Sequence, residues 1–144
     1  PKEGEKKLND GIISRVHSSI SYDQLMKEYK KSDIALHVES FNIKNRLNVR
    51  MSFSTKIIDC LDSGCAVMAI CDKKQGGYMY LKEKDAAICV DSPKMIEKAL
   101  KNILNDPQSI QIYREKALKC GRENHLKEKI LLDLQNDFCN ITNF

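Results

Sequence analysis

The stretch Arg50-Met-Ser-Phe-Ser-Thr-Lys-Ile-Ile-Asp-Cys-Leu-Asp-Ser-Gly-Cys-Ala-Val-Met-Ala-Ile70 carries the clearest structural pattern in the chain. Residues 55–62 have their apolar side chains at helical spacing, and Gly64 follows as a typical C-terminal stop, so a helix is predicted. Residues 65–70 are continuously apolar, which predicts a strand buried on both faces. The stretch therefore predicts a loop, a short helix and a core strand in succession.

The start of this helix has the chemistry of an anion-binding site. A helix N-terminus offers unpaired backbone N–H groups and a partial positive charge. Ser54 and Thr55 add hydroxyl donors, while Arg50 and Lys56 add full charges suited to phosphate oxygens. Asp59 lies three residues after Lys56 on roughly the same helical face, where a carboxylate can bind a ribose diol. A plain N-cap at Ser54 and an exposed Lys56–Asp59 pair are the alternative interpretation of the same residues.

Working outward, strands alternate with helices along the chain. The predicted strands are 12–17, 33–38, 65–70 and 86–90. The predicted helices are 22–31, which starts at a capping box of Ser21 and Gln24, then 55–62, 78–84, 93–105, 108–120 and 123–138. This alternation implies an α/β fold: a Rossmann-like, doubly wound parallel sheet with helices on both faces. Ligands of such sheets bind beyond the carboxyl ends of the strands.

Four finer expectations accompany this fold. The strand at 33–38 is almost continuously apolar, which predicts burial on both of its faces. Residues 39–51 are polar and aperiodic, which predicts a loop. The pair Gly76-Gly77 predicts a turn. The last helix has an apolar stripe formed by Leu126, Ile130, Leu134 and Phe138, which is expected to pack on the core of its own domain or, as the alternative, on another domain.

The composition fits one compact domain. The chain has 144 residues, of which 42% are apolar and 31% charged, with a net charge of +4. Lysines are mixed with acids and no basic stripe with interleaved aromatics is visible, so nucleic acid is not an expected partner. No apolar run approaches the roughly 20 residues that a bilayer requires. The six cysteines lack zinc-ligand spacing, so we expect reduced thiols and no bound metal. Reduced thiols indicate a cytoplasmic location, and a position at the inner face of a membrane fits them equally well.

One stretch, which follows a predicted strand and loop, is Ser52-Phe-Ser-Thr-Lys-Ile-Ile-Asp-Cys-Leu-Asp-Ser-Gly-Cys-Ala-Val-Met-Ala69. This stretch resembles the second-domain signature of GT-B glycosyltransferases. It is most similar to bacterial enzymes of capsule, O-antigen and exopolysaccharide clusters. The run from Tyr29 to Leu36 resembles the family's approach to the preceding strand, and the run from Tyr80 to Ile88 resembles the approach to the following one. The resemblance spans about residues 12–125.

The resemblance implies two Rossmann-like domains that face each other across a cleft, of which the second binds the nucleotide of an activated sugar. By position, Ser54, Thr55 and Lys56 correspond to diphosphate-binding residues and Asp59 to the ribose-binding residue. Val16 and His17 correspond to the place where the base packs. The expected partners are a nucleotide-sugar donor, which is a substrate rather than a cofactor, and a saccharide or lipid-linked acceptor.

The chain also departs from the family's pattern. Many retaining relatives have an acid eight positions before the ribose-binding residue, and Met51 stands at that position here. Glu39 lies in a longer loop from which it can approach the donor sugar, and the retaining or inverting outcome stays open. The sheet is shorter than the family's and the acceptor-binding domain is absent, so we expect a fragment that binds nucleotide weakly and transfers no sugar.

No catalytic residue is assigned from this half. His37, inside an apolar strand, is interpreted as a core residue or strand-end contact, and His125 as a capping or surface residue. One alternative function is a non-catalytic, doubly wound interaction or signalling domain, which would bind no nucleoside diphosphate. A dehydrogenase is disfavoured because the chain has no Gly-x-Gly-x-x-Gly motif.

Overall fold

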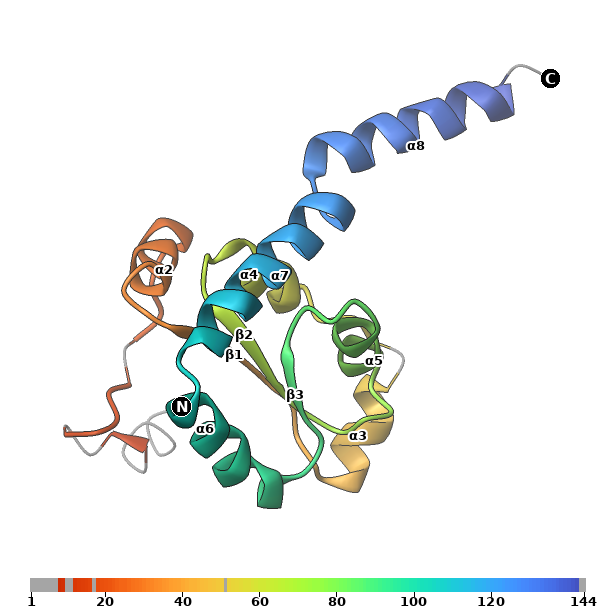
Figure 1. The fold of residues 1–144 in the computed structure, drawn as a ribbon. Coiled ribbons are helices and arrows are strands. Elements are labelled where there is room, and N and C mark those ends of the chain that lie inside the picture. Colours follow the sequence, from red (N-terminus) through yellow and green to blue (C-terminus); the bar gives the residue numbers. More distant parts are fainter. Residues whose placement is uncertain (1–7, 10–11, 17, 51, 143–144) are drawn as a thin grey trace.

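The computed structural model describes residues 8, 9, 12–16, 18–50 and 52–142. Its strands form one parallel sheet in the order β1-β2-β3 (Figure 1). The strands are β1 (Ile34–Val38), β2 (Ala66–Ile70) and β3 (Ile88–Val90). The helices are α2 (Tyr22–Tyr29), α3 (Ile43–Val49), α4 (Lys56–Asp62), α5 (Gly76–Glu83), the 3₁₀ turn η1 (Pro93–Met95), α6 (Ile96–Asn105), α7 (Gln108–Asn124) and α8 (Lys127–Thr142).

The parallel pairing predicted from the sequence is confirmed. β1 runs beside β2 with Ile34 opposite Ala66 and Val38 opposite Ile70. β3 pairs with the other edge of β2 through the same kind of parallel ladder. The central strand β2 is buried along its whole length, as its continuous apolar sequence predicts.

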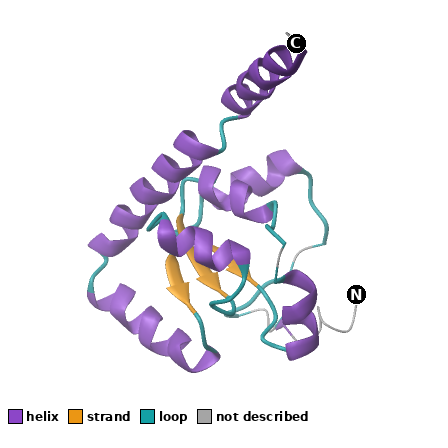
Figure 2. Ribbon diagram, turned by 90° about the vertical axis from the view of Figure 1, so that its right-hand side faces the viewer, coloured by secondary structure: helices purple, strands orange, loops and turns teal. Residues whose placement is uncertain are grey.

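Helices cover both faces of the sheet, as predicted (Figure 2). On one face, Val67 of β2 belongs to a core that contains Ile57 and Leu61 of α4 together with buried residues of α5 and α7. On the other face, Met68 packs in a second cluster with Ile103 of α6. Each of these fully buried aliphatic side chains contributes about 1.5–3 kcal/mol of burial free energy, so the sheet is held from both sides.

The local signals around α2 and α4 are also confirmed. The Ser21 hydroxyl accepts from the Gln24 backbone N–H, and the Gln24 side chain accepts from the Ser21 N–H, which completes the capping box. Gly64 has a φ of +78° immediately after α4. Because that left-handed conformation is open to glycine and costly for other residues, the helix ends there and the chain turns into β2.

The expectation that β1 is buried on both faces is wrong. Ala35 and His37 are buried, whereas Leu36 and Val38 are each 58% exposed. β1 is an edge strand of the described sheet, and no described helix covers these two side chains. An apolar sequence can show that a strand suits a core, but it does not show whether a layer lies over each face.

The predicted strand at 12–17 is not found in residues 12–16, and His17 lies outside the described residues. Ile12 and Ile13 are 88% and 91% exposed, and none of the described strands pairs with this segment. The preference of β-branched residues for strands depends on packing against a pleated neighbour. Without such a neighbour, the composition of the segment does not produce a strand.

Two predicted irregular segments are helical instead. Residues 39–51 contain α3, whose N-cap Asn42 accepts a hydrogen bond from the Lys44 N–H at 3.0 Å. Gly76 and Gly77 are the first residues of α5 rather than a turn. The Gly76 N–H donates to the Arg50 carbonyl at 3.2 Å, which joins the end of the α3 segment to the start of α5.

The last helix does not pack on the core of its own domain, which was one of the two arrangements expected for it. α7 continues to Asn124, and α8 begins at Lys127 and extends away from the body in both ribbon views (Figures 1 and 2). The expected core stripe is exposed: Leu126 by 46%, Ile130 by 49%, Leu134 by 49% and Phe138 by 61%. None of the described helices is long and apolar enough to span a bilayer.

Candidate functional site

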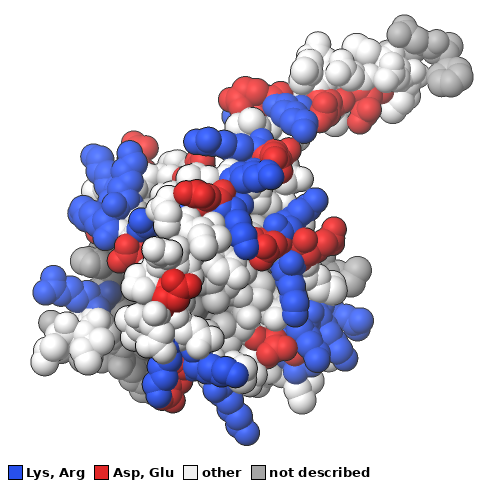
Figure 3. Space-filling model, in the orientation of Figure 1, with Lys and Arg blue, Asp and Glu red and all other residues white. Residues whose placement is uncertain are grey.

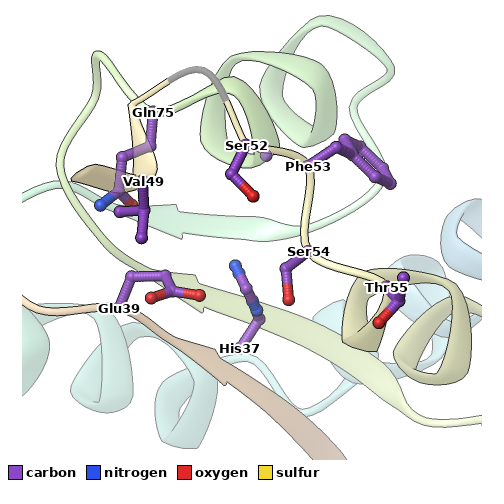
Figure 4. Close-up of a pocket in the computed structure, with 9 residues that line it drawn as sticks. His37, Glu39, Val49, Ser52, Phe53, Ser54, Thr55 and Gln75 are labelled. Carbon is purple, nitrogen blue, oxygen red and sulfur yellow. The ribbon is translucent and has the colours of Figure 1, made fainter. Parts of the chain in front are cut away.

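A cavity of about 260 Å³ opens beyond the carboxyl ends of β1 and β2 (Figure 4). It lies where the doubly wound arrangement predicts a ligand site. Its walls come from the end of β1, the loop before α4 and the start of α5. The lining residues are His37, Glu39, Val49, Ser52, Phe53, Ser54, Thr55, Gln75 and Gly77.

Close approach of α5 to α4 shapes one wall of the cavity, and it depends on Gly77. A Cβ placed on Gly77 would lie 2.6 Å from the Cδ1 of Ile57 and 3.7 Å from the Nε2 of His37. Ile57 is fully buried, so little space exists for it to move. Glycine at this position lets the first turn of α5 sit against α4 and brings Gln75 to the cavity wall.

The start of α4 presents donors at the cavity. The Ile57 N–H donates to the Ser54 carbonyl at 3.0 Å and the Ile58 N–H to the Thr55 carbonyl at 3.1 Å. The N–H groups of Ser54, Thr55 and Lys56 donate to no described residue. Thr55 stands at the N-cap without a side-chain capping bond. The predicted combination of free N–H groups and hydroxyls is therefore present at this helix start.

His37 lies at the centre of the cavity in Figure 4. Its side chain is buried, and it hydrogen-bonds to no described residue. Burial lowers the pKa of the ring, Glu39 opposes that shift and Lys56 adds to it, so the neutral imidazole is favoured near pH 7. The sequence interpretation of His37 as a core residue or strand-end contact agrees with its burial and with its place at the end of β1.

Gln75 is a site residue that sequence reasoning missed. It is only 4% exposed, and neither its Nε2 nor its Oε1 has a hydrogen-bond partner among the described residues. A buried amide left unpaired costs about 1–3 kcal/mol relative to a paired one. Its position before Gly76-Gly77 gave no signal, because that pair predicted a turn and polar residues are common in turns.

An aromatic cluster of Phe53, Tyr80 and His125 holds the loop before α4. The Phe53 ring lies 5.2 Å from the Tyr80 ring edge-on and 6.0 Å from the His125 ring in a stacked arrangement. The Tyr80 hydroxyl lies 2.8 Å from the His125 Nε2 and 3.4 Å from the Cys120 Sγ. His125, interpreted from the sequence as a capping or surface residue, is the C-cap of α7 and joins this cluster.

The predicted site residues do not all reach the cavity. Ser54 and Thr55 line it, whereas Arg50 and Lys56 are exposed beside it. Asp59 is half-buried and lines a separate hollow of about 240 Å³. Val16 is half-buried and lines neither space. His17, together with Met51, lies outside the described residues.

Lys56 and Asp59 do not form the exposed ion pair that the alternative interpretation offers. Among the described residues, the ion pairs involve neither side chain. Basic and acidic side chains are intermixed over the face drawn in Figure 3. No cluster of potential metal ligands occurs in the described part of the chain.

The fold and the cavity thus define an α/β domain with a ligand site at the carboxyl end of a parallel sheet. The profile of a family described as glycosyl transferase-like matches residues 5–135, and the chain belongs to that family. No curated protein and no solved structure gives a significant match to it. The family match establishes a glycosyltransferase domain, in agreement with the resemblance found in the sequence.

Proposed function

We propose that this chain is the donor-binding domain of a glycosyltransferase that transfers a sugar from a nucleoside diphosphate to a polysaccharide or lipid-linked acceptor. It would form the C-terminal half of a GT-B enzyme, with hexosyl groups as the transferred sugars. The observation that carries the proposal is the cavity beyond β1 and β2, which ends at the start of α4, where the N–H groups of Ser54, Thr55 and Lys56 donate to no described residue. Family membership supports the reaction class.

In this proposal the diphosphate lies at the start of α4. Ser54 and Thr55 supply hydroxyl and backbone donors there, and Lys56 and Arg50 supply positive charge from beside the cavity. These groups would neutralise the negative charge that builds up on the leaving diphosphate, which is an electrostatic contribution to catalysis. In this proposal another domain of the enzyme would hold the acceptor.

The size of the cavity favours a donor that extends out of it. Ligand sites usually measure about 300–1,000 Å³ for a drug-sized molecule, and this cavity, at about 260 Å³, accommodates only a part of a nucleotide sugar. A donor with its diphosphate at Lys56 would continue along the first turn of α4 toward Asp59, which lines the neighbouring hollow. Asp59 is our candidate for the ribose.

Removal of the Lys56 charge tests this assignment. Lys56→Ala should weaken the binding of a nucleoside diphosphate by about tenfold or more, because a hydrogen bond to a charged group contributes about 1.5–3 kcal/mol. Lys56 is exposed, so the unfolding midpoint should not change. Lys94→Ala, at another exposed lysine, is the matched control. Equal affinity of wild type and Lys56→Ala, measured by calorimetry, would contradict the assignment.

A further inference from the structure

The end of the cavity away from α4 has a different chemistry from the phosphate end. Figure 4 shows Glu39, Val49 and Gln75 gathered on one side, Thr55 on the other, and His37 between them. The Gln75 amide is buried, and both of its polar atoms lack partners among the described residues. Glu39 contributes a half-buried carboxylate. These side chains form what we call the Gln75 subsite: His37, Glu39 and Gln75.

The donors and acceptors of this subsite suit hydroxyl groups better than phosphate. A phosphate oxygen only accepts hydrogen bonds, and so do the Glu39 carboxylate and the Gln75 Oε1. A phosphate placed here could therefore form no hydrogen bond with these two groups. A hydroxyl group both donates and accepts. Sugar hydroxyls can therefore donate to Glu39 and to the Gln75 Oε1 while they accept from the Gln75 Nε2. The neutral His37 ring offers one further donor and one further acceptor.

From these observations we infer that Gln75, with Glu39 and His37, recognises the hydroxyl groups of the donor's sugar ring. The inference rests on the proposed function and adds the residues that distinguish a nucleotide sugar from the bare nucleotide. Binding of the sugar would give partners to the buried Gln75 amide, which has none among the described residues. Its contribution should therefore appear in the affinity for the sugar conjugate and not in that for the nucleoside diphosphate.

The test compares Gln75→Met with wild type in calorimetric titrations of the whole chain. Met is close to Gln in length and removes both polar atoms of the amide. The probes are UDP, GDP and ADP, each alongside a hexose conjugate (UDP-glucose, GDP-mannose and ADP-glucose). Gln108→Met, at an exposed glutamine that does not line the cavity, is the matched control. Thermal unfolding of each variant reports whether the fold is intact.

Wild type should bind one sugar conjugate more tightly than its parent nucleotide. Gln75→Met should lower the ratio of these two affinities by about tenfold, while the affinity for the nucleotide itself stays unchanged. Its unfolding midpoint should stay equal or rise, since an unpaired buried amide is removed. A lower midpoint with an unchanged preference would show a structural role and overturn the inference. An equal loss for nucleotide and conjugate, or no preference in wild type, would overturn it and leave the proposed function intact. Failure of wild type to bind any nucleotide or conjugate would overturn both.

Discussion

Substitution of Gly77 by alanine probes the contact that shapes the cavity. The added Cβ would lie 2.6 Å from the Cδ1 of Ile57, about 0.9 Å short of the roughly 3.5 Å at which two carbon atoms attract each other. Ile57 is fully buried on α4, so relief of the clash requires its side chain to repack in the core or α4 and α5 to move apart. Overpacking of this kind costs about 1–3 kcal/mol. Gly77 does not have a positive φ, so packing alone opposes the side chain.

Gly76→Ala is the matched control, one residue away in the same helix. Its Cβ would lie 3.5 Å from the Ser52 carbonyl oxygen and 3.8 Å from that of Arg50, which are ordinary contacts. Both substitutions gain the higher helix propensity of alanine, worth at most about 1 kcal/mol. The difference between the two variants therefore isolates the overpacking of Gly77.

Urea denaturation of both variants measures that difference. Gly77→Ala should be about 1–3 kcal/mol less stable than Gly76→Ala, which corresponds to a thermal midpoint lower by about 3–12 °C in a domain of this size. Because Ile57 directly follows Lys56, Gly77→Ala should also weaken the binding of nucleoside diphosphate. Equal stability of the two variants would refute the close packing of α5 on α4 and the cavity shape derived from it.

Two further predictions concern the cavity and the aromatic cluster behind its loop. Tyr80→Phe should lower the free energy of unfolding by about 1 kcal/mol in urea denaturation, since it removes a hydroxyl that bonds to His125 and contacts Cys120. The control Tyr113→Phe, which keeps its ring beside Lys116, should change stability less. Equal effects of the two substitutions would contradict a stabilising role of the bond between Tyr80 and His125. Burial lowers the pKa of His37 from its ordinary 6.5. As the pH falls below about 6.5, the His37 ring therefore becomes protonated in the unfolded chain before it does in the folded one, and the free energy of unfolding should decrease. His37→Leu should flatten this dependence in thermal melts between pH 7.5 and 5.5, and an unchanged slope would contradict the burial of a neutral ring.

The segment from the start of α4 to the end of β2 was predictable because its signals are local. Apolar spacing identifies a helix with one buried side, and Gly64 provides the positive φ that ends it. The short, continuous apolar run that follows Gly64 is typical of a buried strand, and it forms β2. These are properties of neighbouring residues, so sequence alone determines them.

Features that depend on distant neighbours were not predictable. The apolar residues of α8 predict a helix with one hydrophobic side, yet Phe138 on that side is 61% exposed. Ile12 and Ile13 favour a strand, yet they are 88% and 91% exposed and their segment is not one of the strands of the described sheet. In each case the pattern identifies a surface that suits burial, and a tertiary contact decides whether it is buried.

The candidate site was predictable in part, for the same reason. Ser54 and Thr55 follow from the signal of a helix start, and both line the cavity. Gln75 belongs to a different segment, which follows β2 in the sequence, and the close packing of Gly77 against Ile57 brings it to the cavity. No local pattern marks such a residue. Asp59 was assigned by position in the family signature, and its hollow is separate from the cavity.

The central claim is that the start of α4 holds the diphosphate of a sugar donor. The most direct test is a titration of the isotope-labelled chain with UDP, GDP and ADP, followed by the NMR signals of the backbone amides. We expect one nucleotide to give saturable shifts that are largest for the N–H groups of Ser54, Thr55 and Lys56, which donate to no described residue. Shifts centred elsewhere, or no saturable shifts with any of the three nucleotides, would contradict it.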